Sequence, residues 1–199
     1  MPYTPTDLSE LLGSRICHDL ISPLGAISNG IELLTMSGQP VSPEIELIAE
    51  SIANANARVR FFRIAFGVAP DGHFIGKKEV VSILEDVCRG SKIDIRWEVE
   101  GKLGRSDVKA AYLAIQCLET ALSYGGEITV SVISNVWQIQ AKAEKLKIDV
   151  ALWEQLKSGI ASNGLAPAHI QFALLPAELS RQGRRPETMV TADTVTIRY

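Results

Sequence analysis

A histidine followed by an acid lies near the start of the chain, at His18 and Asp19, and Ser22 and Pro23 follow one helical turn later. An exposed imidazole is a usable nucleophile because its ordinary pKa leaves one ring nitrogen free near neutral pH. A neighbouring carboxylate can orient the ring and stabilise its protonated form. Arg15, three residues earlier, offers a charge that offsets a phosphate. The pattern makes His18 a candidate nucleophile, although on this residue alone a solvated histidine without a role is the favoured interpretation.

The histidine lies in a stretch with the periodicity of a long amphipathic helix, from about residue 6 to about residue 36. Counted at about 100° per residue, His18 lies well over 100° from most of the apolar positions. Pro23 would remove a backbone hydrogen bond at a cost of about 3 kcal/mol, which favours a functional kink over a tolerated one. The apolar positions are Leu12, Ile16, Leu20, Leu24, Ile27, Ile31 and Leu34.

A second helix is predicted after Ser42, with Pro43 at its first position, and it ends near Gly67. The short connection makes the two helices an antiparallel hairpin. Two helices bury too little apolar surface to be stable alone, so we expect a homodimer that forms a four-helix bundle. The alternative is a hairpin that packs on its own C-terminal domain.

The predicted fold class is α+β, with an N-terminal helical hairpin and a C-terminal α/β sandwich. Residues 1–67 form the hairpin domain, residues 68–78 a turn-rich linker, and residues 79–199 the second domain. Helices on one face of a sheet are expected there. The expected helices are 80–88, 107–124, 151–158 and 168–182, and the expected strands are 93–99, 127–133, 136–141, 189–192 and 194–199.

Composition excludes several classes of protein. Apolar residues make up 46% of the chain, but no run of about 18 of them could span a membrane. The net charge of −3 is spread along the chain, which argues against nucleic acid as a partner. The N-terminus lacks the pattern of a signal peptide, and the three cysteines are too far apart for a metal site, so we expect a cytoplasmic protein.

The run from His18 to Leu24 resembles the phospho-accepting box of dimeric histidine kinases. Together with residues 26–34 it is similar to ChpT-type histidine phosphotransferases of alphaproteobacteria. The resemblance implies a homodimer with a degenerate kinase-like ATPase domain, in which His18 is phosphorylated and Asp19 is its acidic neighbour. It also implies a hybrid histidine kinase receiver domain (CckA type) as donor and response regulators (CtrA and CpdR type) as acceptors.

The residues that a kinase of this kind uses to bind ATP are missing. Gln116 and Thr120 stand where such kinases carry asparagine, and residues 139–147 replace the expected Asp-x-Gly-x-Gly run. No glycine there allows a close approach of the backbone to a nucleotide. We therefore expect no cofactor, and magnesium supplied by the receiver domain.

The candidate site residues are His18 as phospho-acceptor and Asp19 as orienting acid, and the candidate receiver contacts are Arg15, Ser22, Lys142 and Leu146. Basic residues suit the acidic pocket of a receiver domain, although residues 142–147 also fit a solvated loop. The leading interpretation is a histidine phosphotransferase. The alternatives are a diverged ATP-dependent histidine kinase and a non-catalytic dimeric module that binds receivers.

Overall fold

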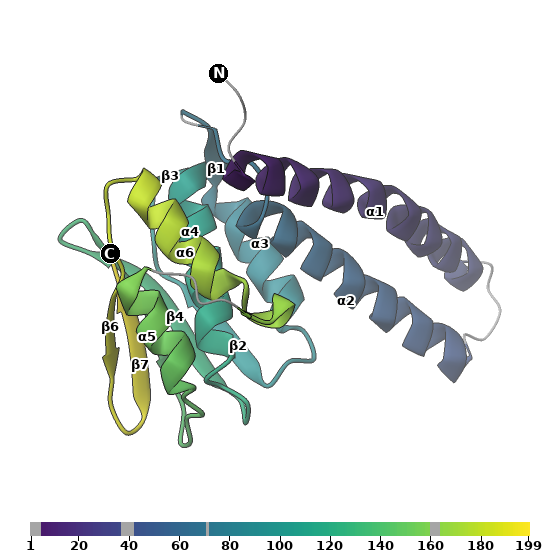
Figure 1. Cartoon of the computed structure of the whole chain (residues 1–199). Helices are drawn as coiled ribbons and strands as arrows, with labels where there is room; N and C mark the ends of the chain where they lie inside the picture. Colours follow the sequence, from purple (N-terminus) through teal and green to yellow (C-terminus); the bar gives the residue numbers. More distant parts are fainter. Residues whose placement is uncertain (1–4, 37–41, 71, 160–163) are drawn as a thin grey trace. The chain divides into compact units, whose positions relative to one another are not determined.

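The computed structural model describes residues 5–36, 42–70, 72–159 and 164–199, with side chains from residue 9 onward. The chain forms two compact units (Figure 1). Unit 1 comprises Met1–Ala69 and Ser82–Arg89, and unit 2 comprises Pro70–Val81 and Gly90–Tyr199. Each is described separately. Among the described residues, no helix is long and apolar enough to cross a membrane.

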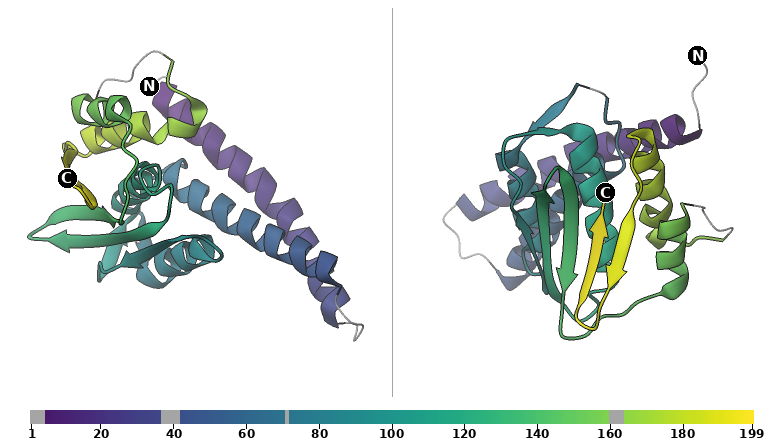
Figure 2. Two further views of the ribbon diagram at one scale, coloured as in Figure 1. Left: turned by 90° about the horizontal axis from the view of Figure 1, so that it is seen from below. Right: turned by 90° about the vertical axis from the view of Figure 1, so that its left-hand side faces the viewer.

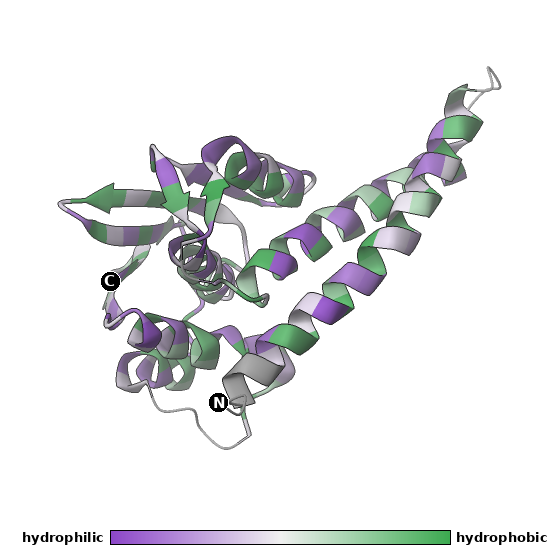
Figure 3. Ribbon diagram, turned by 90° about the horizontal axis from the view of Figure 1, so that it is seen from above, coloured by the Kyte–Doolittle hydropathy of each residue, from purple (hydrophilic) through white to green (hydrophobic). Residues whose placement is uncertain are grey.

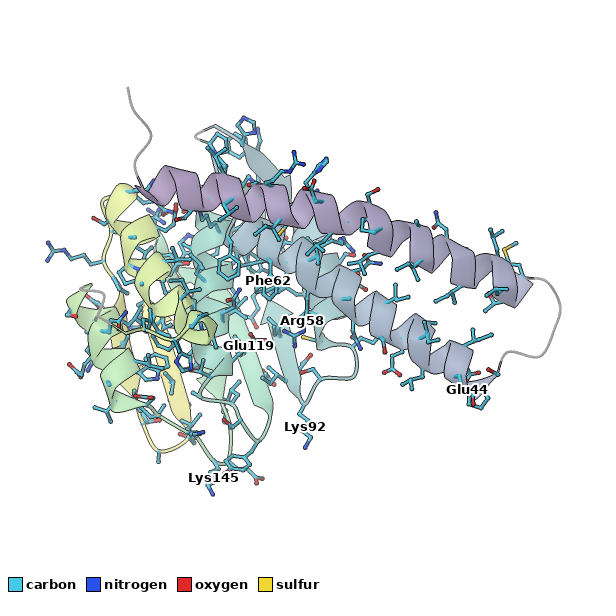
Figure 4. All side chains as sticks on the ribbon, turned by 45° about the vertical axis from the view of Figure 1, so that its right-hand side comes forward. Glu44, Arg58, Phe62, Lys92, Glu119 and Lys145 are labelled. Atoms are coloured by element: carbon cyan, nitrogen blue, oxygen red, sulfur yellow. The ribbon has the colours of Figure 1, made fainter. Side chains whose placement is uncertain are left out.

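Unit 1 is built on the helices α1 (Pro5–Met36) and α2 (Pro43–Ala65), which confirms the predicted hairpin. Ser42 has an extended backbone, and its carbonyl accepts the first hydrogen bonds of α2, from Ile45 and Glu46. Glu44 lies in that first turn (Figure 4), where a hydrogen bond from Ser42 holds its pKa below the ordinary value. A carboxylate at this end of a helix also complements the helix dipole.

The last part of α3 (Lys77–Cys88) belongs to unit 1 as well. Asp86 lies near its end and receives hydrogen bonds from Arg60 of α2 at 2.9 Å and from Arg89 at 3.1 Å. The bond from Arg60 is part-buried and is therefore less screened by solvent than an ion pair at the surface, whereas the bond from Arg89 is exposed. Asp86 therefore links α3 to the second helix of the hairpin.

The hairpin leaves apolar side chains uncovered along its length, and both helices show bands of hydrophobic residues in Figure 3. On α1, the most regular set recurs at spacings of four or seven and is about half exposed. We call this set the apolar stripe: it consists of Leu12, Ile16, Leu20, Ile27 and Leu34. On α2, Leu47 and Ile48 are also exposed. Such a surface is costly to leave in water.

Unit 2 contains a five-stranded sheet in the order β2-β4-β5-β7-β6. β2 is parallel to β4 and the other pairs are antiparallel. The strands predicted at 127–133 and 136–141 form an antiparallel hairpin, and Ser134 and Asn135 between them have the positive φ that a tight turn of this kind requires. The strands are β2 (Ile93–Trp97), β4 (Gly126–Ile133), β5 (Val136–Lys142), β6 (Glu187–Val190) and β7 (Thr194–Arg198).

The helices of unit 2 lie on one face of this sheet (Figure 2), as predicted for an α/β sandwich. α4 (Arg105–Glu119) is almost wholly buried and packs against α6 (Gln171–Arg181), next to α5 (Val150–Ser158). Sheet residues that face the helices, such as Ile128, Val130 and Ile139, are fully buried. The alternate residues are mainly polar, which explains why the other face needs no cover.

One charged pair lies in this core. The ammonium of Lys109 on α4 lies 3.6 Å from the carboxylate of Glu178 on α6, and the two side chains are 4% and 3% exposed. Arg181 and Gln182 also donate hydrogen bonds to Glu178. A buried carboxylate needs such partners because its desolvation is expensive.

Several predicted boundaries are corrected by the structure. The segment 68–78, interpreted as a linker, contains β1 (Phe74–Gly76) and the start of α3, and β1 pairs with β3 (Lys102–Gly104) in a separate two-stranded sheet. Three residues are too few to show the alternation that identifies a strand. The helix predicted at 107–124 is α4 and ends at Glu119, and the one at 168–182 divides into η1 (Pro167–His169) and α6.

Candidate functional site

His18 projects from α1 into solvent, with 83% of its side chain exposed. The apolar stripe lies on the other side of the helix, since His18 is about 180° from Ile27 at about 100° per residue. Cys17, directly before the histidine, is buried, and burial raises the pKa of its thiol, with Arg63 acting against that shift. The helix therefore holds the imidazole on a surface that its own packing does not use.

The carboxylate of Asp19 bridges two neighbours with its two oxygens. Oδ1 lies 3.2 Å from Nδ1 of His18, and Oδ2 accepts a hydrogen bond of 2.7 Å from Nε of Arg15. The bond with His18 and then the one from Arg15 hold the pKa of Asp19 below its ordinary value. A carboxylate accepts only, so a neutral ring bonded to it carries its proton on Nδ1 and has its lone pair on Nε2.

Contacts one turn earlier fix this part of α1 against the end of α2. The hydroxyl of Ser14 accepts the backbone N–H of Val68 at 3.1 Å. At Gly13 an added Cβ would lie 3.0 Å from the carbonyl oxygen of Phe66, which is tighter than nine in ten real contacts of a Cβ atom. Glycine and serine at these positions therefore let the two backbones approach closely just before His18.

The other predicted contacts are divided between the units. Ser22 is exposed on α1, about 40° around the helix from His18. Lys142 is the exposed last residue of β5, and Leu146 is half-buried in the loop that follows, so both belong to unit 2. In the same loop, the Lys145 ammonium lies 4.8 Å from the ring centre of Tyr124 (Figure 4).

The two positions considered for ATP binding lie on or directly after α4. Gln116 is buried within that helix, and the hydroxyl of Thr120 donates to the carbonyl of Cys117 at 2.7 Å. The hydroxyl is thus used locally, as is common near a helix end. Sequence reasoning missed the bond from Arg15 to Asp19, although their spacing of four residues on a helix is a signal for such a pair.

A family model for the histidine phosphotransferase C-terminal domain matches residues 77–194. The protein phosphotransferase ChpT of Brucella abortus (strain 2308) is 35% identical over 181 residues, which cover 86% of each chain. The chain belongs to the ChpT-type histidine phosphotransferase family. A solved bacterial phosphotransferase supports this assignment, with 28% identity, a TM-score of 0.71 and coverage of 100% of this chain and 98% of the other.

Membership of this family makes the protein a transferase of a phosphorelay, as the sequence predicts. The family model begins at residue 77 and therefore lies outside the hairpin. The assignment of His18, Asp19, Arg15 and Ser22 does not follow from that match and rests on the chemistry of α1.

Proposed function

We propose that this histidine phosphotransferase carries phosphate on His18, taking it from a receiver-domain aspartate and passing it to another without ATP. The observation behind this proposal is the exposed imidazole whose Nδ1 is bonded to Asp19. That arrangement leaves Nε2 as the nucleophile. The receiver domain of a hybrid histidine kinase is the proposed donor, and response regulators are the proposed acceptors.

The transfer is a displacement at phosphorus. The Nε2 lone pair of His18 forms a bond to the phosphorus of an aspartyl phosphate while the bond from phosphorus to the aspartate oxygen breaks. The aspartate leaves as a carboxylate, and the phosphorylated ring keeps its proton on Nδ1, facing Asp19. The carboxylate of Asp19 offsets the positive charge of that ring. Transfer to the second receiver is the reverse of this step.

Magnesium and the acidic pocket are proposed to come from the receiver. Ser22, Lys142 and Leu146 are the proposed receiver contacts, and Ser22 shares the exposed side of α1 with His18. The same role is predicted for Arg15, whose guanidinium is bonded to Asp19. The cytoplasm is the proposed location, which suits three free cysteines and a partner that is an intracellular signalling domain.

A homodimer through α1 and α2 is part of the proposal. Exposed apolar side chains are stabilised when they are shielded from water, and here they comprise the apolar stripe of α1 with Leu47 and Ile48 of α2. A second copy of the chain offers an identical surface to pack against them. Packing the stripes of two chains together would leave both copies of His18 facing outward, because the histidine lies on the opposite side of α1.

The central test is transfer of radiolabel from a phosphorylated receiver domain to the full-length chain. His18→Ala should abolish uptake without changing the fold, since an exposed side chain leaves no cavity. His73→Ala is the matched control, because His73 is exposed in unit 2, and it should accept label normally. Acid-labile, base-stable label on His18→Ala at the wild-type rate would refute the proposal.

Independence from ATP needs its own measurement. The side-chain nitrogen of buried Gln116 has no hydrogen-bond partner in the described part of the chain. Because a polar group without a partner is able to bond a ligand, nucleotide binding should be measured directly. Calorimetry with magnesium and ATP should show no saturable binding. A dissociation constant below about 100 μM, or roughly −5.5 kcal/mol, would support the diverged kinase instead.

A further inference from the structure

We infer that Arg15 is a positioning residue for phosphotransfer, which holds the carboxylate of Asp19 in the orientation that bonds Nδ1 of His18. This inference rests on the proposed role of His18 as the phosphate carrier. It gives Arg15 a role within the chain itself, in addition to any contact with a receiver.

The geometry of the helix explains why Asp19 needs such a partner. Adjacent residues on a helix point about 100° apart, so Asp19 does not naturally face His18. Arg15 lies one turn earlier, and its direction falls between the two, about 60° from His18 and about 40° from Asp19. The hydrogen bond from Arg15 therefore turns the carboxylate of Asp19 towards the imidazole.

The two distances indicate that the bond from Arg15 to Asp19 is stronger than the bond between Asp19 and His18. The bond from Arg15 Nε to Asp19 Oδ2 is 2.7 Å, which is typical of a charge-assisted hydrogen bond, whereas Nδ1 of His18 lies 3.2 Å from the other oxygen. The side chains of Arg15, Asp19 and His18 are 74%, 49% and 83% exposed, so packing covers only part of the Asp19 side chain. The guanidinium is the partner that can restrain its rotation.

The consequence for chemistry is the choice of the reactive ring nitrogen. A neutral imidazole carries its proton on either nitrogen, and the hydrogen bond made by one nitrogen decides which. With Asp19 held in place, the proton stays on Nδ1 and the lone pair on Nε2. Without Arg15, the carboxylate turns into solvent more often, and the fraction of rings with a proton on Nε2 should rise.

A cycle of mutations separates this role from direct contact with the phosphate or the receiver. Single-turnover transfer should be measured for the wild type, Arg15→Ala, Asp19→Ala and the double variant. Exposed ion pairs are weak, so Arg15→Ala should slow transfer by about two- to five-fold. Asp19→Ala should slow it on the order of 10²-fold. The double variant should be slower than Asp19→Ala by less than the full factor of Arg15→Ala, because the part of the Arg15 effect that passes through Asp19 is already lost.

A double variant slower than Asp19→Ala by the full factor of Arg15→Ala would overturn the inference, since Arg15 would then act independently of Asp19. Arg58→Ala is the matched control. Arg58 is an exposed arginine on α2 of the same unit (Figure 4), and its loss removes the same charge without touching Asp19. It should transfer phosphate at the wild-type rate.

The tautomer gives a readout that does not depend on transfer. Nitrogen-15 NMR of the unphosphorylated chain should show His18 mainly with its proton on Nδ1, with the signal assigned through His18→Asn. Arg15→Ala should raise the fraction protonated on Nε2, and Arg58→Ala should not. An unchanged tautomer in Arg15→Ala would overturn the inference, whereas normal phosphate uptake by His18→Ala would overturn the proposed function and leave this measurement intact.

Discussion

Replacing two residues of the apolar stripe should separate the proposed dimer into single chains. Ile16 and Ile27 are 50% and 49% exposed in one chain, and both point away from His18. Full burial of such a side chain is worth about 1.5–3 kcal/mol, so covering the exposed half should contribute about 1 kcal/mol. The double variant Ile16→Gln/Ile27→Gln changes four side chains per dimer and should cost about 4 kcal/mol.

That loss corresponds to a roughly 10³-fold weaker dimer. Glutamine keeps a good helix propensity, so the hairpin itself should still form. Light scattering across a range of concentrations measures the dissociation constant, and circular dichroism checks the helix content. Leu11→Gln is the matched control, since Leu11 is 42% exposed but lies on the His18 side of α1. It should leave the dimer intact.

Two outcomes would refute this reasoning. A wild-type chain that scatters as a single 21.6 kDa species at micromolar concentration would remove the dimer itself. A double variant with an unchanged dissociation constant would show that the stripe is not the interface. An equal effect of Leu11→Gln would lead to the same conclusion.

Three further outcomes concern the buried charged pair, the glycine after α2 and the carboxyl of Asp19. Lys109→Met should lower the free energy of unfolding, measured in urea, by about 3 kcal/mol, because it removes a positive charge beside the buried carboxylate of Glu178. A loss under about 1 kcal/mol would contradict this. Gly67→Ala should lower the free energy of unfolding by about 1–3 kcal/mol in thermal unfolding, because an added Cβ would lie 2.2 Å from a carbonyl oxygen of α2. Gly25→Ala is the control: its added Cβ meets nothing within 4 Å, so it should not destabilise the protein. The carboxyl of Asp19 should titrate below its ordinary value of 3.8 in carbon-13 NMR. Because this pKa is depressed on folding, its stabilising contribution is present above the unfolded pKa and is lost as the pH falls through the folded one, and a midpoint at or above 3.8 would contradict the bonds drawn here.

Helical periodicity was sufficient to predict the hairpin and the exposed side of α1 that carries His18. The reason is that α1 is long, so its apolar residues repeat many times along one side. The pairs β1–β3 and Lys109–Glu178 could not be predicted in the same way. The first is too short to show a period, and the second joins residues that are far apart in the sequence.

The bond between Arg15 and Asp19 is an intermediate case. Its spacing of four residues is visible in the sequence, but the sequence does not say which of several neighbours the guanidinium selects. An arginine near a histidine that is proposed to carry phosphate suggests a contact with phosphate. Only the side-chain positions show that the arginine bonds the carboxylate of Asp19 instead.

The division of α3 between the two units determines which fragments of this protein keep a complete unit. Unit 1 is not contiguous in the sequence, since it needs Ser82–Arg89 as well as the hairpin. A fragment that ends at Ala69 would lose Asp86 and leave Arg60 without its acceptor. A gene fusion that transplants the helices α1 and α2 alone would therefore carry an incomplete fold. The shortest transferable fragment must extend through α3, including the strand β1 that belongs to the other unit.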